Sequence, residues 1–171
     1  MALARAYKVG VFDTSTPLAT GATVATTTPT PILHGTTSAS GDCNISAIRC
    51  GVVAGTTFPA NGVATIGLNI VTGAQAGGNA AVASQLSGVA LAAQTTFLTA
   101  GGTSAAAITT VTLGKFLWSQ DLPFTAGSSW GEWFTPGFEI NIPVSTKFAV
   151  YVICSAGGTA TTFSAELEFT E

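Results

Sequence analysis

The last third of the chain alternates between apolar and polar residues. From residue 163 to 169 every second position is Phe, Ala or Leu, and the positions between are Ser or Glu. Residues 138–142 alternate in a similar way, and Phe148, Val150, Val152 and Cys154 share one face of a further segment. A period of two is typical of a strand with one face in a core and the other in water. The Gly157-Gly158 pair and Pro143 mark turns between the segments. We therefore expect three consecutive antiparallel strands here.

The upstream part repeats this pattern less regularly. In residues 110–118 the alternation places Phe116 and Trp118 on the same face of a further strand. The segment Ala80–Phe97 is rich in Ala and Leu and is the one helix expected, although Gly88 interrupts it. Strands are also expected at residues 5–12, 42–53 and 66–70.

Seven or eight short strands with Gly-bounded turns predict an all-β fold, an antiparallel β-sandwich or barrel, in a single domain spanning residues 1–171. Long connections near residues 13–41 and 72–107 suit a jelly roll better than a simple meander. Residues 13–41 carry Pro17, Pro29 and Pro31 and read as a long extended arm or loop. Such a segment either wraps a neighbouring subunit or is a surface loop.

Charge is scarce along the whole chain. Only 8% of residues are charged, the net charge is −3, and no Lys, Arg, Asp, Glu or His occurs from Cys50 to Gly114. Average domains carry about 25% charged residues. Five basic residues offer no stripe for nucleic acid and little attraction for an anionic membrane. A surface of small neutral residues favours packing against copies of the same chain or against a partner.

No targeting or cofactor signal is evident. The most apolar stretch is interrupted by polar residues, which argues against a membrane-spanning helix, and no signal peptide is recognised, so we expect synthesis in a cytoplasm. The cysteines Cys43, Cys50 and Cys154 have no metal-binding spacing and suit a reduced core, although a Cys43–Cys50 disulfide across a tight hairpin is compatible with the sequence. There is no P-loop or G-x-G-x-x-G, and we expect no metal and no cofactor.

Candidate catalytic groups are weak, and we expect no enzyme. Residues 127–131 fit G-x-S-x-G around Ser129, but no helix is expected to follow, and the one histidine, His34, lies far upstream. Glu166 and Glu168 lie two apart on the polar face of one strand, which is more typical of a solvated face than of an acid–base pair.

Aromatic residues concentrate between residues 116 and 138, which hold every tryptophan of the chain. They fill one end of the core, form a subunit interface, or supply a stacking platform for sugars. The candidate interface residues are Trp118, Phe124, Trp130, Trp133 and Phe134.

The runs 137–143, 146–152 and 163–169 resemble the closing strands of small jelly-roll virion proteins of tailed bacteriophages. The Ala/Thr/Gly-rich, Lys-poor remainder is similar to phage head proteins, above all to capsid decoration (cement) proteins. This resemblance implies a homotrimer on the capsid surface of the virion, bridging subunits of the major capsid protein without catalysing a reaction. The alternative is a receptor- or carbohydrate-binding module of a tail or fibre that uses the tryptophans of residues 118–133.

Overall fold

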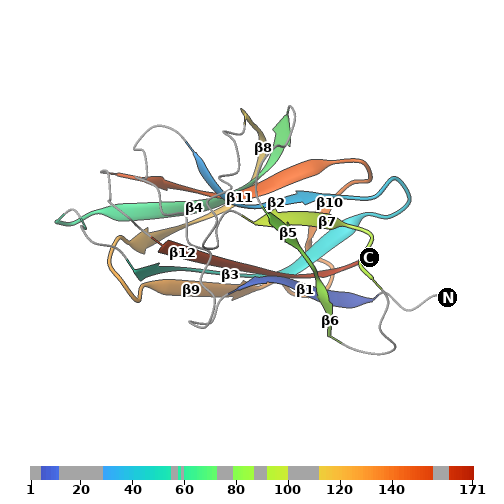
Figure 1. Ribbon diagram of the computed structural model, residues 1–171, viewed down its shortest axis with the longest axis horizontal. Coiled ribbons are helices and arrows are strands. Elements are labelled where there is room, and N and C mark those ends of the chain that lie inside the picture. Colours follow the sequence, from blue (N-terminus) through green and yellow to red (C-terminus); the bar gives the residue numbers. More distant parts are fainter. Residues whose placement is uncertain are drawn as a thin grey trace.

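A computed structural model of the protein describes residues 5–11, 29–54, 58, 60–72, 79–86, 92–99, 112–155 and 162–171. Within these ranges the chain forms twelve strands and no helix. The strands make two antiparallel sheets that lie one above the other (Figure 1). The predicted all-β antiparallel sandwich is therefore confirmed.

Sheet 1, the lower layer in Figure 1, has β3 and β12 at its centre. Its strands run in the order β10-β3-β12-β1-β6, and β9 also pairs with β3. Their bounds are β10 (Ile140–Ile142), β3 (Cys43–Ala54), β12 (Thr162–Thr170), β1 (Ala6–Val11), β6 (Ser84–Gln85) and β9 (Ser129–Trp133). The pairing of β1 with β12 brings the two ends of the described chain together at one end of the sandwich (Figure 1).

Sheet 2, the upper layer, has the order β5-β7-β2-β11-β4-β8. Its strands are β5 (Asn79–Ala81), β7 (Thr96–Thr99), β2 (Thr30–Thr36), β11 (Lys147–Cys154), β4 (Val63–Thr72) and β8 (Thr112–Pro123). A hydrogen bond from Trp118 of β8 to Glu132 of β9 shows that these two sheet edges lie on the same side of the molecule. The short strands β5 and β6 are the edge strands at the other end of the two sheets.

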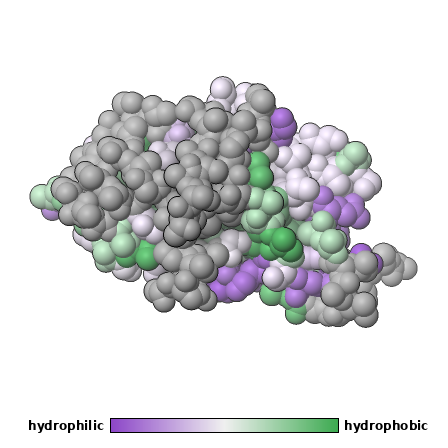
Figure 2. All heavy atoms as spheres, viewed as in Figure 1, coloured by the Kyte–Doolittle hydropathy of each residue, from purple (hydrophilic) through white to green (hydrophobic). Residues whose placement is uncertain are grey.

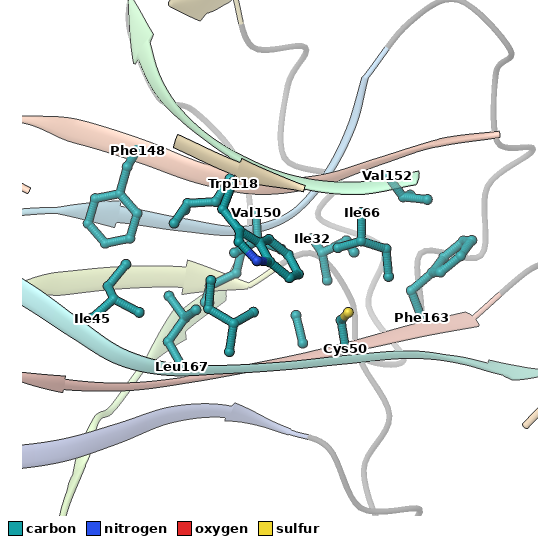
Figure 3. Packing of buried hydrophobic residues seen from close by; sticks show 14 of the residues in the cluster. Ile32, Ile45, Cys50, Ile66, Trp118, Phe148, Val150, Val152, Phe163 and Leu167 are labelled. Atoms are coloured by element: carbon teal, nitrogen blue, oxygen red, sulfur yellow. The ribbon is translucent and has the colours of Figure 1, made fainter. Parts of the chain in front are cut away.

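The core fills the space between the sheets. Phe148, Val150 and Val152 of β11 point down from sheet 2, while Phe163 and Leu167 of β12 point up to meet them (Figure 3). All of these side chains are fully buried. Full burial of one such side chain contributes about 1.5–3 kcal/mol of transfer free energy, so the alternation seen in the sequence dictates how the sheets pack.

The middle of sheet 2 is also buried on its outer face. Ala149 and Val71 pack there against Leu113, and the Tyr151 hydroxyl lies 3.1 Å from Asn69 Oδ1, to which it donates. This burial explains why β11 reads as an almost continuous apolar run and why β2 shows no alternation of apolar and polar residues.

Two predicted segments are corrected by the structure. The helix expected at Ala80–Phe97 is wrong, because parts of that segment form β5, β6 and β7. The extended arm expected at 13–41 is wrong for residues 30–36, which form the buried strand β2, while residues 13–28 lie outside the described residues.

The predicted last three strands exist, but they are not neighbours. β10 and β12 belong to sheet 1 and both pair with β3, whereas β11 lies in sheet 2 between β2 and β4. Alternation along each strand gives its buried face but carries no information on which sheet receives it.

Candidate interaction surface

The five predicted interface aromatics do not share one environment. Trp118 and Phe124 are buried in the core, and Phe134 is partly buried against it. Trp130 and Trp133, both on the edge strand β9, are 46% and 62% exposed. Two of the five predicted residues, Trp118 and Phe124, are therefore core residues, and only the two tryptophans of β9 are exposed to solvent.

Alternation along β9 separates its two tryptophans. Trp133 lies opposite Ala47, on the outer face of sheet 1, where the Arg49 guanidinium carbon is 5.0 Å from the centre of its ring. Trp130 lies opposite the core residue Cys50, on the inner side of the sheet edge. Because the indoles point to opposite faces, they do not form a single stacking platform.

A hydrogen bond joins the edges of the two sheets on this side. Trp118 Nε1, from β8 of sheet 2, donates to Glu132 Oε2 of β9 at 2.7 Å. The carboxylate is thereby held at the margin of the core, and the indole N–H of a buried tryptophan is satisfied. This contact fixes β9 relative to β8.

Two further aromatics are exposed on the same side, Phe116 on β8 and Phe138 before β10. Phe138 was expected to share the buried face of a strand, and this is wrong: the strand begins only at Ile140, and Phe138 follows a turn in which its N–H donates to Thr135 O at 2.8 Å. Gly137 has a φ of 89° in this turn, which glycine adopts without strain. We call Phe116, Trp130, Trp133 and Phe138 the aromatic rim.

An open groove of about 430 Å³ lies beside the rim, between the end of sheet 1 and the edge of sheet 2. Lys115 brings the one charged side chain to the lining. The lining residues are Ile70, Lys115, Leu117, Asn141, Pro143 and Thr146.

The outer face of sheet 1 carries an ion-pair cluster. Glu166 of β12 accepts from Lys8 of β1 and from Arg49 of β3, each at 2.9 Å, and Arg49 also reaches Glu168 at 3.0 Å. The Glu166 side chain is only 4% exposed, so these partners supply the stabilisation that water gives an exposed carboxylate. The cluster ties three adjacent strands together.

The candidate catalytic groups lie apart. Ser129 opens β9 of sheet 1, whereas His34 is buried in β2 of sheet 2, opposite Ala149 and Leu98. Among the residues that the structure describes, neither ring nitrogen of His34 has a hydrogen-bond partner, and burial lowers the pKa of this histidine to about 4. Glu166 and Glu168 are both paired with Arg49, which is an arrangement for structure rather than for an acid–base pair.

The three cysteines are free and buried. Cys43 and Cys50 lie on the same strand, seven residues and therefore roughly 23 Å apart, so a hairpin disulfide between them is ruled out. Burial raises the pKa of both thiols to about 12. They act as small apolar side chains of the core.

In the described ranges, no three His, Cys, Asp or Glu residues come together in a way that could hold a metal ion. Those ranges also contain no helix long and apolar enough to cross a membrane.

The fold and this surface define an antiparallel β-sandwich with an aromatic rim at one open side. Comparisons with family models, with curated proteins and with solved structures found no match.

Proposed function

We propose that this is a structural virion protein, a capsid decoration or cement protein that binds the outer face of a phage head and bridges major capsid subunits. The observation that carries the proposal is the aromatic rim, four exposed aromatics on a surface with few charges. Protein interfaces are enriched in aromatics and depleted of charge at their centres. Synthesis in the host cytoplasm and residence on the capsid surface follow from this role.

We further propose that the sandwich is of the jelly-roll type. The strand pairing supports this, because the pairs are nested along the chain: β1 with β12, β2 with β11, β3 with β9 and β10, and β4 with β8. The additional pairs β12–β3 and β11–β4 join these nested pairs side by side. Jelly rolls are two-sheet, eight-stranded folds that occur in viral capsid proteins.

The face in Figure 2 supports a binding role over a chemical one. Where its atoms are coloured, pale residues of intermediate hydropathy and scattered green patches cover most of it, and purple hydrophilic residues are confined to a few areas. The separation of Ser129 from His34, and the pairing of Glu166 and Glu168 with Arg49, favour a protein without catalytic activity.

Binding to virions tests this function. Phage heads are prepared from the phage whose genome encodes this chain, and the native copies of the protein are stripped from them. Purified tagged protein is then mixed with these heads, and the bound protein is measured after a density gradient. We expect saturable binding that the double change W133A/F138A weakens roughly 30-fold or more. V82A is the matched control, because Val82 is 88% exposed on the opposite side of the sandwich. Protein that stays at the top of the gradient would contradict the proposal.

The second candidate function is a receptor- or carbohydrate-binding module of a tail or fibre. The exposed Trp133 ring, lying beside Arg49 on the outer face of sheet 1, favours it. Binding to immobilised glycans that is lost in W133A and kept in W130A would support this function over capsid binding, because only Trp133 lies on that face.

A further inference from the structure

β9 is a sheet edge with unused backbone groups. The hydrogen bonds from Phe134 N to Ser46 O and from Val52 N to Ser128 O fix the ladder with β3. In an antiparallel ladder the backbone groups of alternate residues point toward the partner strand. The backbone N–H and C=O groups of Trp130 and Glu132 therefore point toward β3, and those of Ser129, Gly131 and Trp133 point away from it. No described residue forms a hydrogen bond with those outward groups.

The long edge of sheet 2 is closed by contrast. In β8, Pro123 has no N–H, its carbonyl accepts from Thr125, and the Gln120 amide occupies the Asp121 carbonyl. Two register shifts against β4 further break the regular course of β8. Proline, charge and bulges are the usual means of protecting an edge from a second strand. The remaining edge strands β5, β6 and β10 span three residues or fewer.

We propose that β9 pairs with β9 of a second copy of this chain, antiparallel and about a two-fold axis through Gly131. In this register Gly131 lies opposite its own copy, and Ser129 lies opposite Trp133 of that copy. The outward N–H and C=O groups at all three positions are then satisfied, and the two copies of sheet 1 become one continuous sheet.

The side chains of β9 suit this register. Glu132 is its one charged residue, and pairing about Gly131 sets Glu132 opposite Trp130 rather than opposite a second Glu132. Trp118 holds only one oxygen of Glu132, so the other oxygen is free to accept from the indole N–H of the opposing Trp130, which has no partner in the described structure. The register therefore avoids a repulsion between two Glu132 carboxylates and offers each of them an indole N–H donor.

Glycine at the axis has a further consequence. A Cβ on Gly131 would be 3.4 Å from the Trp133 ring, so this ring leans over Gly131 on the outer face of the sheet. Across the axis the two Trp133 rings, one from each copy, then cover the glycine pair. The dimer places two aromatic rims side by side on one surface.

The test is the change G131P, compared with G131A as its matched control. Proline removes the two central hydrogen bonds of the dimer, but the N–H that it deletes makes no bond to any described residue of the monomer, so we expect the fold to be kept. Sedimentation velocity of the full chain between about 1 and about 100 µM gives the dimer dissociation constant. We expect wild type and G131A to dimerise and G131P to weaken dimerisation roughly 10- to 100-fold, with unchanged circular dichroism.

A second variant, G131K, covers the case that G131P fails to fold, because it keeps the N–H and sets two like charges opposite each other at the axis. A monomeric wild type, a wild-type trimer, or dimerisation unchanged in both G131P and G131K would overturn the proposal. Head binding by the monomeric G131P would leave the proposed function standing on its own.

Discussion

At the scale of single residues, His34 makes stability depend on pH. Its pKa is about 4 in the folded protein and about 6.5 in the unfolded chain, so the unfolded chain takes up the proton first as pH falls. The contribution of the neutral His34 to the free energy of unfolding is therefore fully present above pH 6.5. It falls by about 3 kcal/mol at most as the pH drops from 6.5 to 4. Urea unfolding followed by tryptophan fluorescence at pH 7 and pH 4.5 measures this loss.

The change H34L removes the titration and leaves an apolar side chain opposite Leu98 and Ala149. Acidification also protonates carboxylates in both proteins, so the difference between wild type and H34L isolates the histidine. We expect H34L to lose about 2 kcal/mol less than wild type on acidification. Equal losses in the two proteins would show that His34 takes no part.

The ion-pair cluster on sheet 1 gives a second residue-scale prediction. The change E166Q leaves Lys8 and Arg49 without their shared partner, and because both cations are partly exposed we expect a cost of about 2 kcal/mol rather than the full cost of an unpaired buried charge. E168Q removes only the more exposed carboxylate and should cost less than about 1 kcal/mol. Denaturant unfolding at pH 7 compares the two, and equal losses would contradict the ranking.

At the scale of elements, β2 is the strand that the sequence conceals. Its burial is tested by G35A, because a Cβ on Gly35 would lie 2.1 Å from the ring of the buried Phe148. We expect G35A to destabilise the fold by roughly 2 kcal/mol or more, whereas the same change in a surface arm would cost little. Denaturant unfolding provides the value.

A double-mutant cycle provides the control for G35A. F148L by itself removes ring volume from the core, but it also makes room for the new methyl group. The pair G35A/F148L should therefore cost less than the sum of its two single changes. Strict additivity would mean that the ring does not face Gly35.

The strands that were predictable are those whose core-facing residues recur with a period of two. Residues 163–169 alternate because their outer-face positions are polar, with Glu166 and Glu168 paired to Arg49, and their prediction as a strand is confirmed. β2 was missed because sheet 2 buries both faces there, so Pro31, His34 and Gly35 show no period. The Ala-rich segment from residue 80 to 97 favours a helix by local propensity, and the edge strands formed there depend on partners distant in sequence.

Bulges explain the remaining errors at the candidate surface. The period of two predicted that Phe116 and Trp118 lie on one face of β8. The pairing with β4 shifts register between them, because Leu68 lies opposite Trp118 and the next residue, Asn69, lies opposite Phe116. Trp118 is therefore buried and Phe116 is exposed. The concentration of aromatics in residues 116–138 was visible in the sequence. The exposure of each aromatic depends on the bulge in β8 and on the residues at which β9 and β10 begin. No local sequence pattern specifies the bulge or these starting residues.

At the scale of the whole molecule, the nested pairing determines how the chain folds. The innermost pair, β4 with β8, already closes a connection of about 40 residues, and β1–β12 closes almost the whole chain. Closing long loops costs entropy before the contacts form, so we expect slow refolding, in milliseconds to seconds. Stopped-flow tryptophan fluorescence measures the rate, and refolding within microseconds would contradict this expectation.

The same nesting predicts which strands form first. Closing β4–β8 costs less entropy than closing β1–β12, so the transition state should contain the inner pair before the outer one. Leu68 of β4 and Val9 of β1 are both buried in the core and provide matched probes. We expect L68A to slow refolding and V9A mainly to accelerate unfolding, because the contacts of Val9 form after the barrier. The reverse assignment of the two effects would mean that the pairing of the chain ends nucleates the sandwich.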